Sequence, residues 1–245
     1  MIFHISGKDA RFAELRELIS KHGFAVSDAP FGEGINVFPV IAPDPEFLPV
    51  IASLPERSRI LFGKATENER SLCKKRGIRF SELFSSPDYL AENGAATAAG
   101  VLCEALSLFP YELSGAKVLI CGYGNCGAPS ARILRASGCR VTVFSHEGSL
   151  RRAASDGFSV LHGIGGANDF GLIINTVPGA VFDPPEKHIK KGTVFLQVAS
   201  GDAAKNPAAF GANGIDYFRL PGLPAKYAPK SEARAIFAEL RKLTL

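Results

Sequence analysis

The fold of this chain is decided by one stretch, Lys117-Val-Leu-Ile-Cys-Gly-Tyr-Gly-Asn-Cys-Gly127. It begins as an apolar strand and ends in a Gly-x-Gly-x-x-Gly turn. A segment that can form a helix, 128–137, and a second apolar run, 139–144, follow it. This order is the βαβ unit that holds a dinucleotide pyrophosphate at the N-terminus of its helix. The alternative is a tight βα turn that binds nothing, and the flanking strands favour the dinucleotide.

Each glycine of this turn has its own predicted task. Gly122 permits the tight turn, Gly124 lets the backbone approach the phosphates, and Gly127 allows close packing of helix and strand. The free amide groups at the start of the helix face the anion, so we expect Asn125 and Cys126 beside the cofactor as well. A thiol at that position can become reactive, and a packed thiol is the interpretation we prefer.

Composition limits the class of protein. The chain has 245 residues, of which 46% are hydrophobic, which is enough for one large domain or two small ones. The formal net charge of +4 suits an anionic cofactor and substrate. The longest basic block is Lys74-Lys-Arg76, which we interpret as a solvated helix end before Gly77. Nucleic acid is therefore not an expected partner.

The cysteines and histidines indicate neither a disulfide framework nor a metal site. Five cysteines form no Cys-x-x-Cys pair, and three of them lie in or beside the apolar βαβ unit. They are typical of small core residues in a reducing compartment. The five histidines lack metal-ligand spacing. No apolar run reaches the length of a membrane span, so we expect a cytoplasmic protein.

The first third of the chain alternates predicted strands and helices. A strand at 2–6 precedes a helix at 12–22, and short strands follow at 59–62 and 78–80. The apolar run Ile35–Ile41 contains Pro39, which indicates a strand end or an edge strand. The Pro-rich segment 43–55 has room for a short helix at most.

The rest of the chain predicts a parallel sheet. A long helix at 88–108 ends at Pro110, and apolar runs follow at 158–161, 171–175, 193–198 and 216–220. After a Pro-rich loop, 221–229, the last helix carries an apolar stripe that includes Ile236 and Leu240.

The predicted class is therefore α/β, with a C-terminal Rossmann dinucleotide-binding domain and a smaller N-terminal α/β domain, both built on parallel sheets. We place the N-terminal, substrate-side domain at 1–90, a connecting helix at 91–110 and the Rossmann domain at 111–228. The final helix, 229–245, can pack on the first domain. Two such lobes would bind cofactor and substrate in a cleft.

The tip of the second Rossmann strand bears on the choice of dinucleotide. An acidic residue there normally binds the ribose of NAD. Here Ser145 and His146 occupy the tip, and Arg151 and Arg152 follow. Serine and arginine would bind a 2′-phosphate, so the sequence favours NADP(H). If Glu147 faces the ribose instead, the preference reverses to NAD(H).

Candidate chemical groups follow the later strands, because parallel strands present their carboxyl ends to the cofactor. Asn175-Thr-Val-Pro178 is expected beside the cofactor through Thr176, Val177 and Pro178. No catalytic residue is evident, and the candidates are Asn175, Thr176 and Asp202. The alternatives are that Asn175 caps a turn and that Asp202 caps a helix after Ala203.

Substrate-side candidates lie in the first domain, the long helix and the last loop. Lys8, Asp9 and Arg11 come directly after the first strand. Asn93 and Thr97 share a helix face, and Lys226 would bind a carboxylate. Each can also be an ordinary surface or cap residue. From the residues alone, the chain is a two-domain nicotinamide-dependent oxidoreductase or a cofactor-binding sensor.

Further motifs extend over most of the chain. They are Ser6-Gly-Lys-Asp-Ala-Arg11, Asn93-Gly-Ala-Ala-Thr-Ala-Ala-Gly100, the turn 122–127, Ile174-Asn-Thr-Val-Pro178 and Pro221-Gly-Leu-Pro-Ala-Lys-Tyr-Ala-Pro-Lys-Ser231. In this order they resemble motifs of the dipicolinate synthase A-subunit family, a spore-associated enzyme. The last motif is the most specific, since that family has Pro-Gly-Leu-Pro-Gly-x-x-Ala-Pro-x-Thr.

The resemblance implies NADP-linked oxidation of dihydrodipicolinate, a small dicarboxylate, to dipicolinate, in partnership with a flavoprotein-like B subunit. A homo-oligomer is also expected. The chain departs from the family at three places: Ala99 replaces a glutamate, Asn125 replaces an arginine, and Asp202 lies where the family has Pro-Gly-Gly. It resembles a diverged member, whose substrate can differ.

Two other functions stay open from the sequence. One is a related two-domain dehydrogenase of the shikimate dehydrogenase type, although the Lys/Asp catalytic pair of that family is not evident here. The other is a catalytically weak or inactive dinucleotide-binding subunit or regulator. The departures at Ala99 and Asn125 favour this second alternative.

Overall fold

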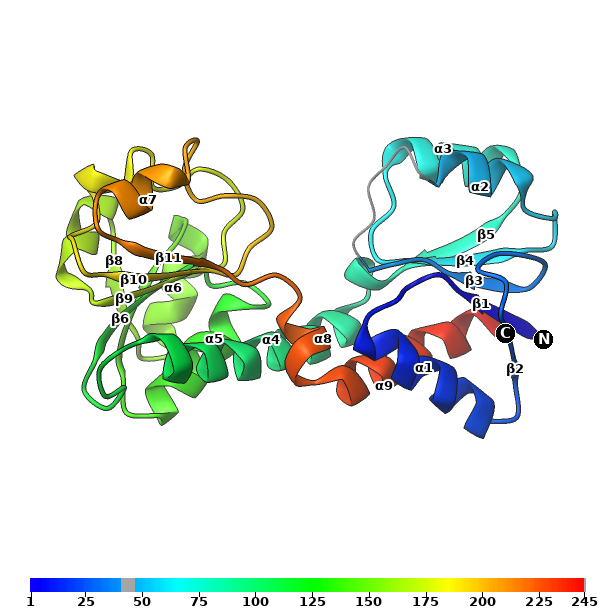
Figure 1. Cartoon of the computed structure of the whole chain (residues 1–245), viewed down its shortest axis with the longest axis horizontal. Coiled ribbons are helices and arrows are strands. Elements are labelled where there is room, and N and C mark those ends of the chain that lie inside the picture. The colour runs from blue at the N-terminus through cyan, green and yellow to red at the C-terminus, as the bar shows by residue number, and fades with distance from the viewer. Residues whose placement is uncertain (41–46, 245) are drawn as a thin grey trace. The chain divides into compact units, whose positions relative to one another are not determined.

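The computed structural model describes residues 1–40 and 47–244. The chain divides into two compact units, Met1–Asn93 with Ala228–Leu245, and Gly94–Tyr227. We call them unit 1 and unit 2. Each contains one sheet in which every strand pair is parallel, so the α/β class predicted from the sequence is confirmed. Helix α4 (Pro87–Leu108) begins in unit 1 and continues in unit 2 (Figure 1).

Unit 1 is a sheet with helices on both faces. Its strands are β1 (Ile2–Ile5), β2 (Ala25–Ser27), β3 (Ile35–Val37), β4 (Arg59–Phe62) and β5 (Arg79–Glu82), in the order β2-β1-β3-β4-β5. Helices α2 (Leu48–Ser53) and α3 (Glu67–Lys75) cover one face, and α1 (Ala10–Lys21) and α9 (Pro229–Thr244) cover the other (Figure 1). A short 3₁₀ helix, η2 (Leu83–Ser85), precedes α4. The strand order reverses at β1, since β2 lies on one side of it and β3 on the other. The carboxyl ends of β1 and β3 therefore mark the topological switch point of this sheet.

Local sequence explains where the helices of unit 1 begin and end. The Asp9 carboxylate caps α1 by accepting a hydrogen bond from the Arg11 amide at 3.2 Å. Thr66 and Glu69 form a capping box at the start of α3. Helix α3 ends at Lys75, and Gly77 follows with φ of +65°. The interpretation of Lys74-Lys-Arg76 as a helix end is therefore confirmed.

Unit 2 has the Rossmann strand order. Its strands are β6 (Lys117–Cys121), β7 (Arg140–Phe144), β8 (Ser159–Leu161), β9 (Leu172–Asn175), β10 (Val194–Gln197) and β11 (Asp216–Arg219), in the order β11-β10-β9-β6-β7-β8. Its further helices are α5 (Gly127–Ala136), α6 (Glu147–Ser155), α7 (Ala208–Ala212), α8 (Leu223–Tyr227), η3 (Ile164–Asp169) and η4 (Pro185–Lys187). The switch point lies between β6 and β9, so the glycine turn and the Asn175 loop meet there.

Both faces of the unit 2 sheet are buried. Val118, Ile120 and Ile174 belong to one apolar cluster, and Leu119 and Ile173 belong to another. Neighbouring residues of a strand point to opposite faces, so these near-continuous apolar runs are what a doubly covered parallel sheet requires. Among the described residues, no helix is both long and apolar enough to cross a bilayer.

Two local expectations need correction. The segment 221–229, interpreted as a loop, contains the short helix α8, because Leu223 and Ala225 find apolar surface to bury against. Residues 199–206 form an irregular loop and the next helix, α7, begins only at Ala208, so Asp202 does not cap a helix. Of the two alternatives that Pro39 indicated, the strand end is confirmed, because β3 ends at Val37 and lies inside the sheet, between β1 and β4. Residues 41–46, which include part of two predicted segments, lie outside the described residues.

Candidate functional site

The glycine turn of unit 2 has a distinct geometry at each glycine. Gly122 has φ of +94°, which L-residues rarely adopt. A Cβ on Gly127 would lie 2.1 Å from the carbonyl oxygen of Gly122, so helix α5 starts in close contact with the turn. A Cβ on Gly124 would meet nothing within 4 Å. Of the three glycines, Gly124 is therefore the one that faces open space at the N-terminal end of α5.

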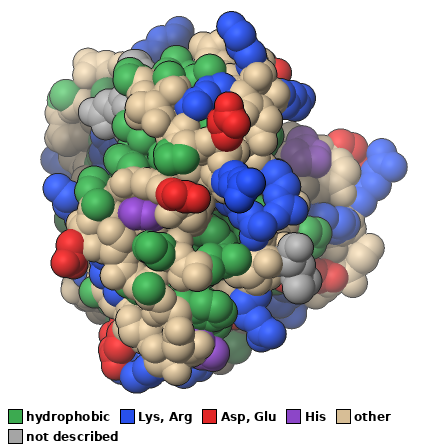
Figure 2. Space-filling model, turned by 90° about the vertical axis from the view of Figure 1, so that its right-hand side faces the viewer, with side chains coloured by type: hydrophobic (Ala, Val, Ile, Leu, Met, Phe, Trp, Pro, Cys, Tyr) green, Lys and Arg blue, Asp and Glu red, His purple; other side chains and the backbone are tan. Residues whose placement is uncertain are grey.

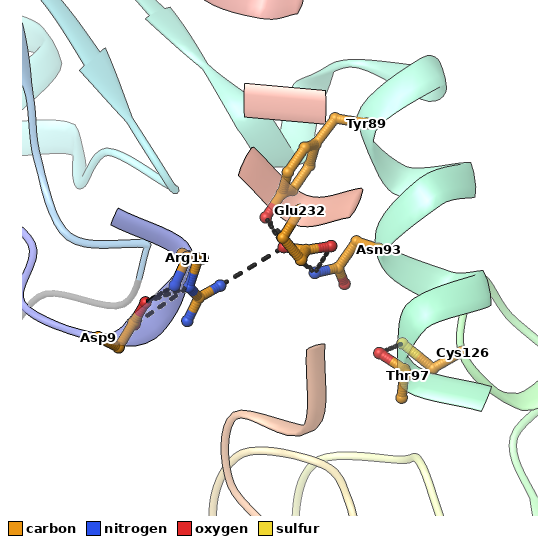
Figure 3. Close-up of polar contacts among 7 residues, drawn as sticks. All are labelled: Asp9, Arg11, Tyr89, Asn93, Thr97, Cys126 and Glu232. Carbon is orange, nitrogen blue, oxygen red and sulfur yellow. Dashed lines mark hydrogen bonds and ion pairs between the residues drawn. The ribbon is translucent and has the colours of Figure 1, made fainter. Parts of the chain in front are cut away.

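Helix α4 packs directly on this turn. A Cβ on Gly94 would lie 2.0 Å from the carbonyl oxygen of Asn125. One turn further along α4, the buried Thr97 lies beside Cys126, with 3.9 Å between Oγ1 and Sγ (Figure 3). The structure thus brings Thr97, predicted on the substrate side, against the cofactor turn within unit 2. Cys126 itself is half-buried.

Two buried amides shape the loops that follow β9 and β10. The Asn175 amide nitrogen donates to the Val177 carbonyl and to Gln197 Oε1, both at 2.9 Å, and its Oδ1 accepts from the Val177 amide at 3.1 Å. The Gln197 amide nitrogen donates to Ala199 at 3.2 Å and to Gly201 at 3.1 Å. Both side chains are almost fully buried. These contacts assign Asn175 to turn capping, the alternative considered for it.

Thr176 connects the loop after β9 to the glycine turn. Its Oγ1 donates to the Cys121 carbonyl at 2.7 Å, and its amide donates to the same oxygen at 2.9 Å. A Cβ on Gly122 would lie 2.5 Å from that Oγ1 and 2.9 Å from a methyl group of Val177. The segment Thr176–Pro178 is thereby held against the turn, on the side where the switch point would accept a ligand.

The tip of β7 presents the residues predicted to distinguish NADP from NAD. Ser145 is half-buried, and His146 Nε2 lies 2.9 Å from the Ser149 hydroxyl at the start of α6. Arg151 is exposed and forms an ion pair with Glu147 at 3.3 Å, one helical turn apart. An exposed pair of this kind contributes little stability, so the Arg151 guanidinium can exchange Glu147 for a phosphate at low cost.

Arg152 has a different position from Arg151. Its guanidinium donates to the carbonyl oxygen of Tyr123, inside the glycine turn. The Tyr123 hydroxyl in turn donates to Asp156 at 2.5 Å, and burial together with this carboxylate raises the pKa of Tyr123 to about 12. Helix α6 is thus fastened to the turn at both of these points. The structure assigns Arg152 to holding the turn, a role that the sequence did not indicate.

Two further predicted residues are engaged within unit 2. Asp202 pairs with Arg219 at 3.3 Å and accepts from the Tyr217 hydroxyl at 3.3 Å. The Lys226 ammonium lies 2.7 Å from the buried Glu104 carboxylate, which also accepts from the Tyr227 hydroxyl at 2.9 Å. Although burial opposes it, the lysine and tyrosine hold the pKa of Glu104 below its usual range. These contacts attach α8 to α4.

In unit 1, residues that follow β1 join a polar cluster around the buried carboxylate of Glu232. The Asp9 carboxylate accepts from Arg11 Nε at 2.9 and 3.0 Å, and Arg11 Nη1 lies 3.5 Å from the Glu232 carboxylate (Figure 3). The Tyr89 hydroxyl donates to Glu232 at 3.0 Å, and the Asn93 amide donates to it at 3.2 Å. The structure therefore links Asp9, Arg11 and Asn93 through Glu232, whereas the exposed Lys8 takes no part in these contacts.

Glu232 is the residue of this cluster that sequence reasoning missed. It lies on α9 and has no exposed surface. Burial raises the pKa of its carboxyl group, although its three donors oppose that shift. A signal was present in the sequence, because Glu232 lies one turn before Ile236 on the apolar stripe of the last helix. A carboxylate within such a stripe is costly unless it is paired.

Other surfaces do not gather the predicted residues. A groove of about 620 Å³ in unit 1 is lined by charged side chains of α4 and α9, including Asp88, Arg234 and Lys242, and by none of the predicted site residues. On the face drawn in Figure 2, basic and acidic side chains are interspersed with apolar ones. Within the described residues, no group of three His, Cys, Asp or Glu could hold a metal ion.

Comparison with known proteins supports the interpretation of unit 2 as a dinucleotide-binding domain. Residues 112–203 match the family model described as acetohydroxy acid isomeroreductase, NADPH-binding domain. That span contains the glycine turn, the tip of β7 and the loops after β9 and β10. Unit 2 is therefore similar in sequence, over this span, to a domain that binds NADPH. No curated protein matches the sequence.

Solved structures extend the likeness to the whole chain. The A subunit of dipicolinate synthase from Bacillus halodurans has a TM-score of 0.80 at 22% identity, covering 99% of this chain and 97% of that one. The A chain of the Bacillus subtilis enzyme also has a TM-score of 0.80, at 20% identity over 100% and 95%. D-lactate dehydrogenase from Escherichia coli has 0.68, at 15% identity over 100% and 97%. At these identities the likeness shows a shared fold.

Proposed function

We propose that this chain is an NADP(H)-dependent dehydrogenase that oxidises a small cyclic dicarboxylate, dihydrodipicolinate, to dipicolinate. One observation carries the cofactor part of the proposal. The glycine turn lies at the switch point of a Rossmann sheet and leaves open space over Gly124, within the span that matches an NADPH-binding domain. The substrate part is supported by the motif resemblance and by the fold shared with the dipicolinate synthase structures.

The choice of NADP(H) over NAD(H) is supported by two side chains. Ser145 stands at the tip of β7, where an acidic residue would repel a 2′-phosphate. The exposed Arg151 lies in the next helix and can bind that phosphate in bidentate fashion. Glu147 holds Arg151 in this structure, so phosphate binding requires Arg151 to leave that pair.

The chain's residues have defined tasks in this scheme. The nicotinamide, when bound, accepts the hydride that a carbon of the dihydropyridine ring loses, and aromatisation of that ring releases a proton. The turn at Gly124 and the amides at the start of α5 would bind the pyrophosphate. Thr176, Val177 and Pro178 would line the cofactor site, held there by Cys121 and by the Asn175–Gln197 pair. Asn175 acts as a positioning residue in this proposal, because its amide is already engaged.

The experiment mixes the purified chain with NADP and freshly prepared dihydrodipicolinate, with and without a dipicolinate synthase B subunit. We expect NADPH and dipicolinate to form in equal amounts. Activity only in the presence of the B subunit would identify that flavoprotein-like protein as an obligatory partner. Size measurement in the same samples tests the proposed homo-oligomer.

Two negative results have different meanings. Tight NADP(H) binding without turnover in either mixture would support the alternative, a dinucleotide-binding subunit whose activity resides in a partner. That alternative is favoured by Ala99 and Asn125, which replace the glutamate and arginine of the related motifs. Absence of NADP(H) and NAD(H) binding would overturn the proposal altogether.

A further inference from the structure

The loop after β1 occupies the switch point of the unit 1 sheet. Both the amide and the hydroxyl of Ser6 donate to the carbonyl oxygen of Val37, at 3.1 and 3.0 Å, and so join the ends of β1 and β3. In open doubly wound sheets, ligands bind outside the carboxyl ends of the strands at this point. The residues that follow Ser6 directly, Lys8 to Arg11, are therefore where unit 1 would bind a ligand.

The Glu232 carboxylate contacts polar side chains from two other helices, α1 and α4. Arg11 approaches it from α1, and Tyr89 and Asn93 approach it from one face of α4 (Figure 3). Asn93 reaches both carboxylate oxygens, at 3.3 and 3.2 Å. Each of these contacts lies within unit 1.

As a contribution to folding stability alone, this buried ion pair would be unfavourable or nearly neutral. Arg11 is 7% exposed and Glu232 is 0% exposed, so both charged groups have lost most of their water. Desolvation of such a pair commonly offsets its attraction, and apolar side chains of similar volume would pack at least as well. Departures from simple packing rules of this kind concentrate at functional sites. Glu232 therefore invites a functional explanation.

The guanidinium of Arg11 is held in a defined orientation by two carboxylates. Its Nε is bound by Asp9, and one terminal nitrogen, Nη1, is directed at Glu232. The other terminal nitrogen is directed away from Glu232 (Figure 3). With two of its corners held, the guanidinium has little freedom to rotate, and its remaining edge is presented in a constant direction. A planar donor group held in this way suits a carboxylate ligand.

We propose that Arg11 binds one carboxylate of the substrate at the β1/β3 switch point, and that Glu232 is the positioning residue that orients the Arg11 guanidinium. The inference rests on the proposed function in taking a dicarboxylate as the substrate. It adds to that function a residue from the last helix, and it gives the ligand of unit 1 a chemical class. Glu232 itself does not touch the substrate in this proposal, because it is fully buried.

The test compares Glu232→Gln with Glu239→Gln. Glu239 is a matched control, since it is a buried glutamate two turns further along α9 that bonds Ser86 and Lys242 instead. We expect Glu232→Gln to raise both the KM for dihydrodipicolinate and the Kd for dipicolinate about tenfold or more. The kcat should change less than about threefold, and the Kd for NADPH less than about twofold. Glu239→Gln should match the wild type in all four quantities.

A second variant keeps the test decisive if Glu232→Gln folds poorly. Arg11→Lys retains the charge but loses the planar fork, and it should weaken dipicolinate binding by at least about tenfold. Isothermal titration with dipicolinate, and with pyridine-2-carboxylate for comparison, measures this binding without turnover. Dipicolinate should bind more tightly than pyridine-2-carboxylate, because it carries a second carboxylate.

The outcomes separate this inference from the proposed function. Turnover by the wild type with an unchanged KM in Glu232→Gln would overturn the role of Glu232 and leave the function intact. Absence of turnover, with dipicolinate binding that weakens in Glu232→Gln and Arg11→Lys, would reject the function and support the subsite. No dipicolinate binding by the wild type, or equal losses in Glu239→Gln, would overturn the inference.

Discussion

The backbone of Gly94 in helix α4 lies against the carbonyl group of Asn125 in the glycine turn. A Cβ on Gly94 would stand 2.0 Å from that oxygen, a distance at which real Cβ atoms are essentially never found. The next atom it would meet, the carbonyl carbon of Asn125, is 3.0 Å away. The position of the turn is thus set from outside the βαβ unit, by a residue of the preceding helix.

Substitution of Gly94 by alanine should therefore displace the turn. We expect the free energy of unfolding to fall by about 1–3 kcal/mol, the usual cost of overpacking, and NADP(H) binding to weaken with it. Urea denaturation and a fluorescence titration with NADPH measure the two effects. Gly211 in α7 is the matched control, since a Cβ there meets nothing within 4 Å. Gly211→Ala should leave the stability unchanged or raise it by about 0.5–1 kcal/mol.

Gly124 should behave in the opposite way from Gly127. A side chain at Gly124 enters open space, so Gly124→Val should change the free energy of unfolding by less than about 0.5 kcal/mol. It should nevertheless weaken NADP(H) binding more than tenfold, or about 1.4 kcal/mol, because the phosphates lose their approach to the backbone. Gly127→Ala should destabilise the fold itself. If Gly124→Val binds NADPH as tightly as the wild type, the prediction that the glycine turn binds the cofactor is wrong.

Arg151 tests the identity of the dinucleotide. If its guanidinium binds the 2′-phosphate, Arg151→Ala should raise the Kd for NADPH about tenfold and leave the Kd for NADH unchanged. The neighbouring Glu147→Ala should tighten NADPH binding, because it frees Arg151 from its ion pair. Titrations of both variants with both cofactors are sufficient. Equal NADPH affinity in Arg151→Ala and the wild type would contradict the NADP assignment.

Glu232 predicts a pH dependence of stability with a definite sign. Because burial raises the pKa of this carboxyl group in the folded protein, the native state binds more protons than the unfolded state above the carboxyl group's ordinary pKa. The contribution of Glu232 is therefore most favourable at acid pH and is lost as the pH rises through the folded pKa. Glu232→Gln cannot titrate, so its stability relative to the wild type should increase with pH. A difference that stays constant in urea denaturation between about pH 4 and pH 8 would contradict this.

Gln197 should prove as important to the loops as Asn175. Gln197→Leu removes the acceptor of the Asn175 amide and the donors for Ala199 and Gly201. Buried groups left without partners cost about 1–3 kcal/mol, so the free energy of unfolding should fall by that amount. Thermal denaturation measures the loss, and saturating NADPH should recover part of it by mass action. A Tm equal to that of the wild type would show that these contacts are dispensable.

Much of unit 2 could be predicted because its signals are local. The apolar runs marked every long strand, and the positive φ of Gly122 and the close contact of Gly127 agree with the tasks assigned to them. Short elements were harder. Helix α8 lies in a Pro-rich segment whose composition is typical of a loop. It forms because the Leu223 side chain is buried in the core of unit 2. The residues that surround Leu223 in the core come from distant parts of the chain, so the local sequence does not reveal them.

The polar residues show the limit more clearly. Arg152 and Arg151 are neighbours in sequence, yet one holds the Tyr123 carbonyl and the other lies exposed beside Glu147. Their difference follows from the helical rotation of about 100° between adjacent residues, which points them to different surroundings. The identity of those surroundings depends on how α6 packs on the turn.

The sequence by itself determined the α/β class, the parallel sheets and the position of the dinucleotide turn, because backbone conformation and apolar periodicity depend on neighbouring residues. Only the tertiary structure decided which polar groups meet. Asn93 and Glu232 are 139 residues apart in the chain, and they share a hydrogen bond because α4 and α9 pack in the same unit. Contacts of this kind arise from the burial of apolar faces elsewhere on those helices, which no local pattern encodes.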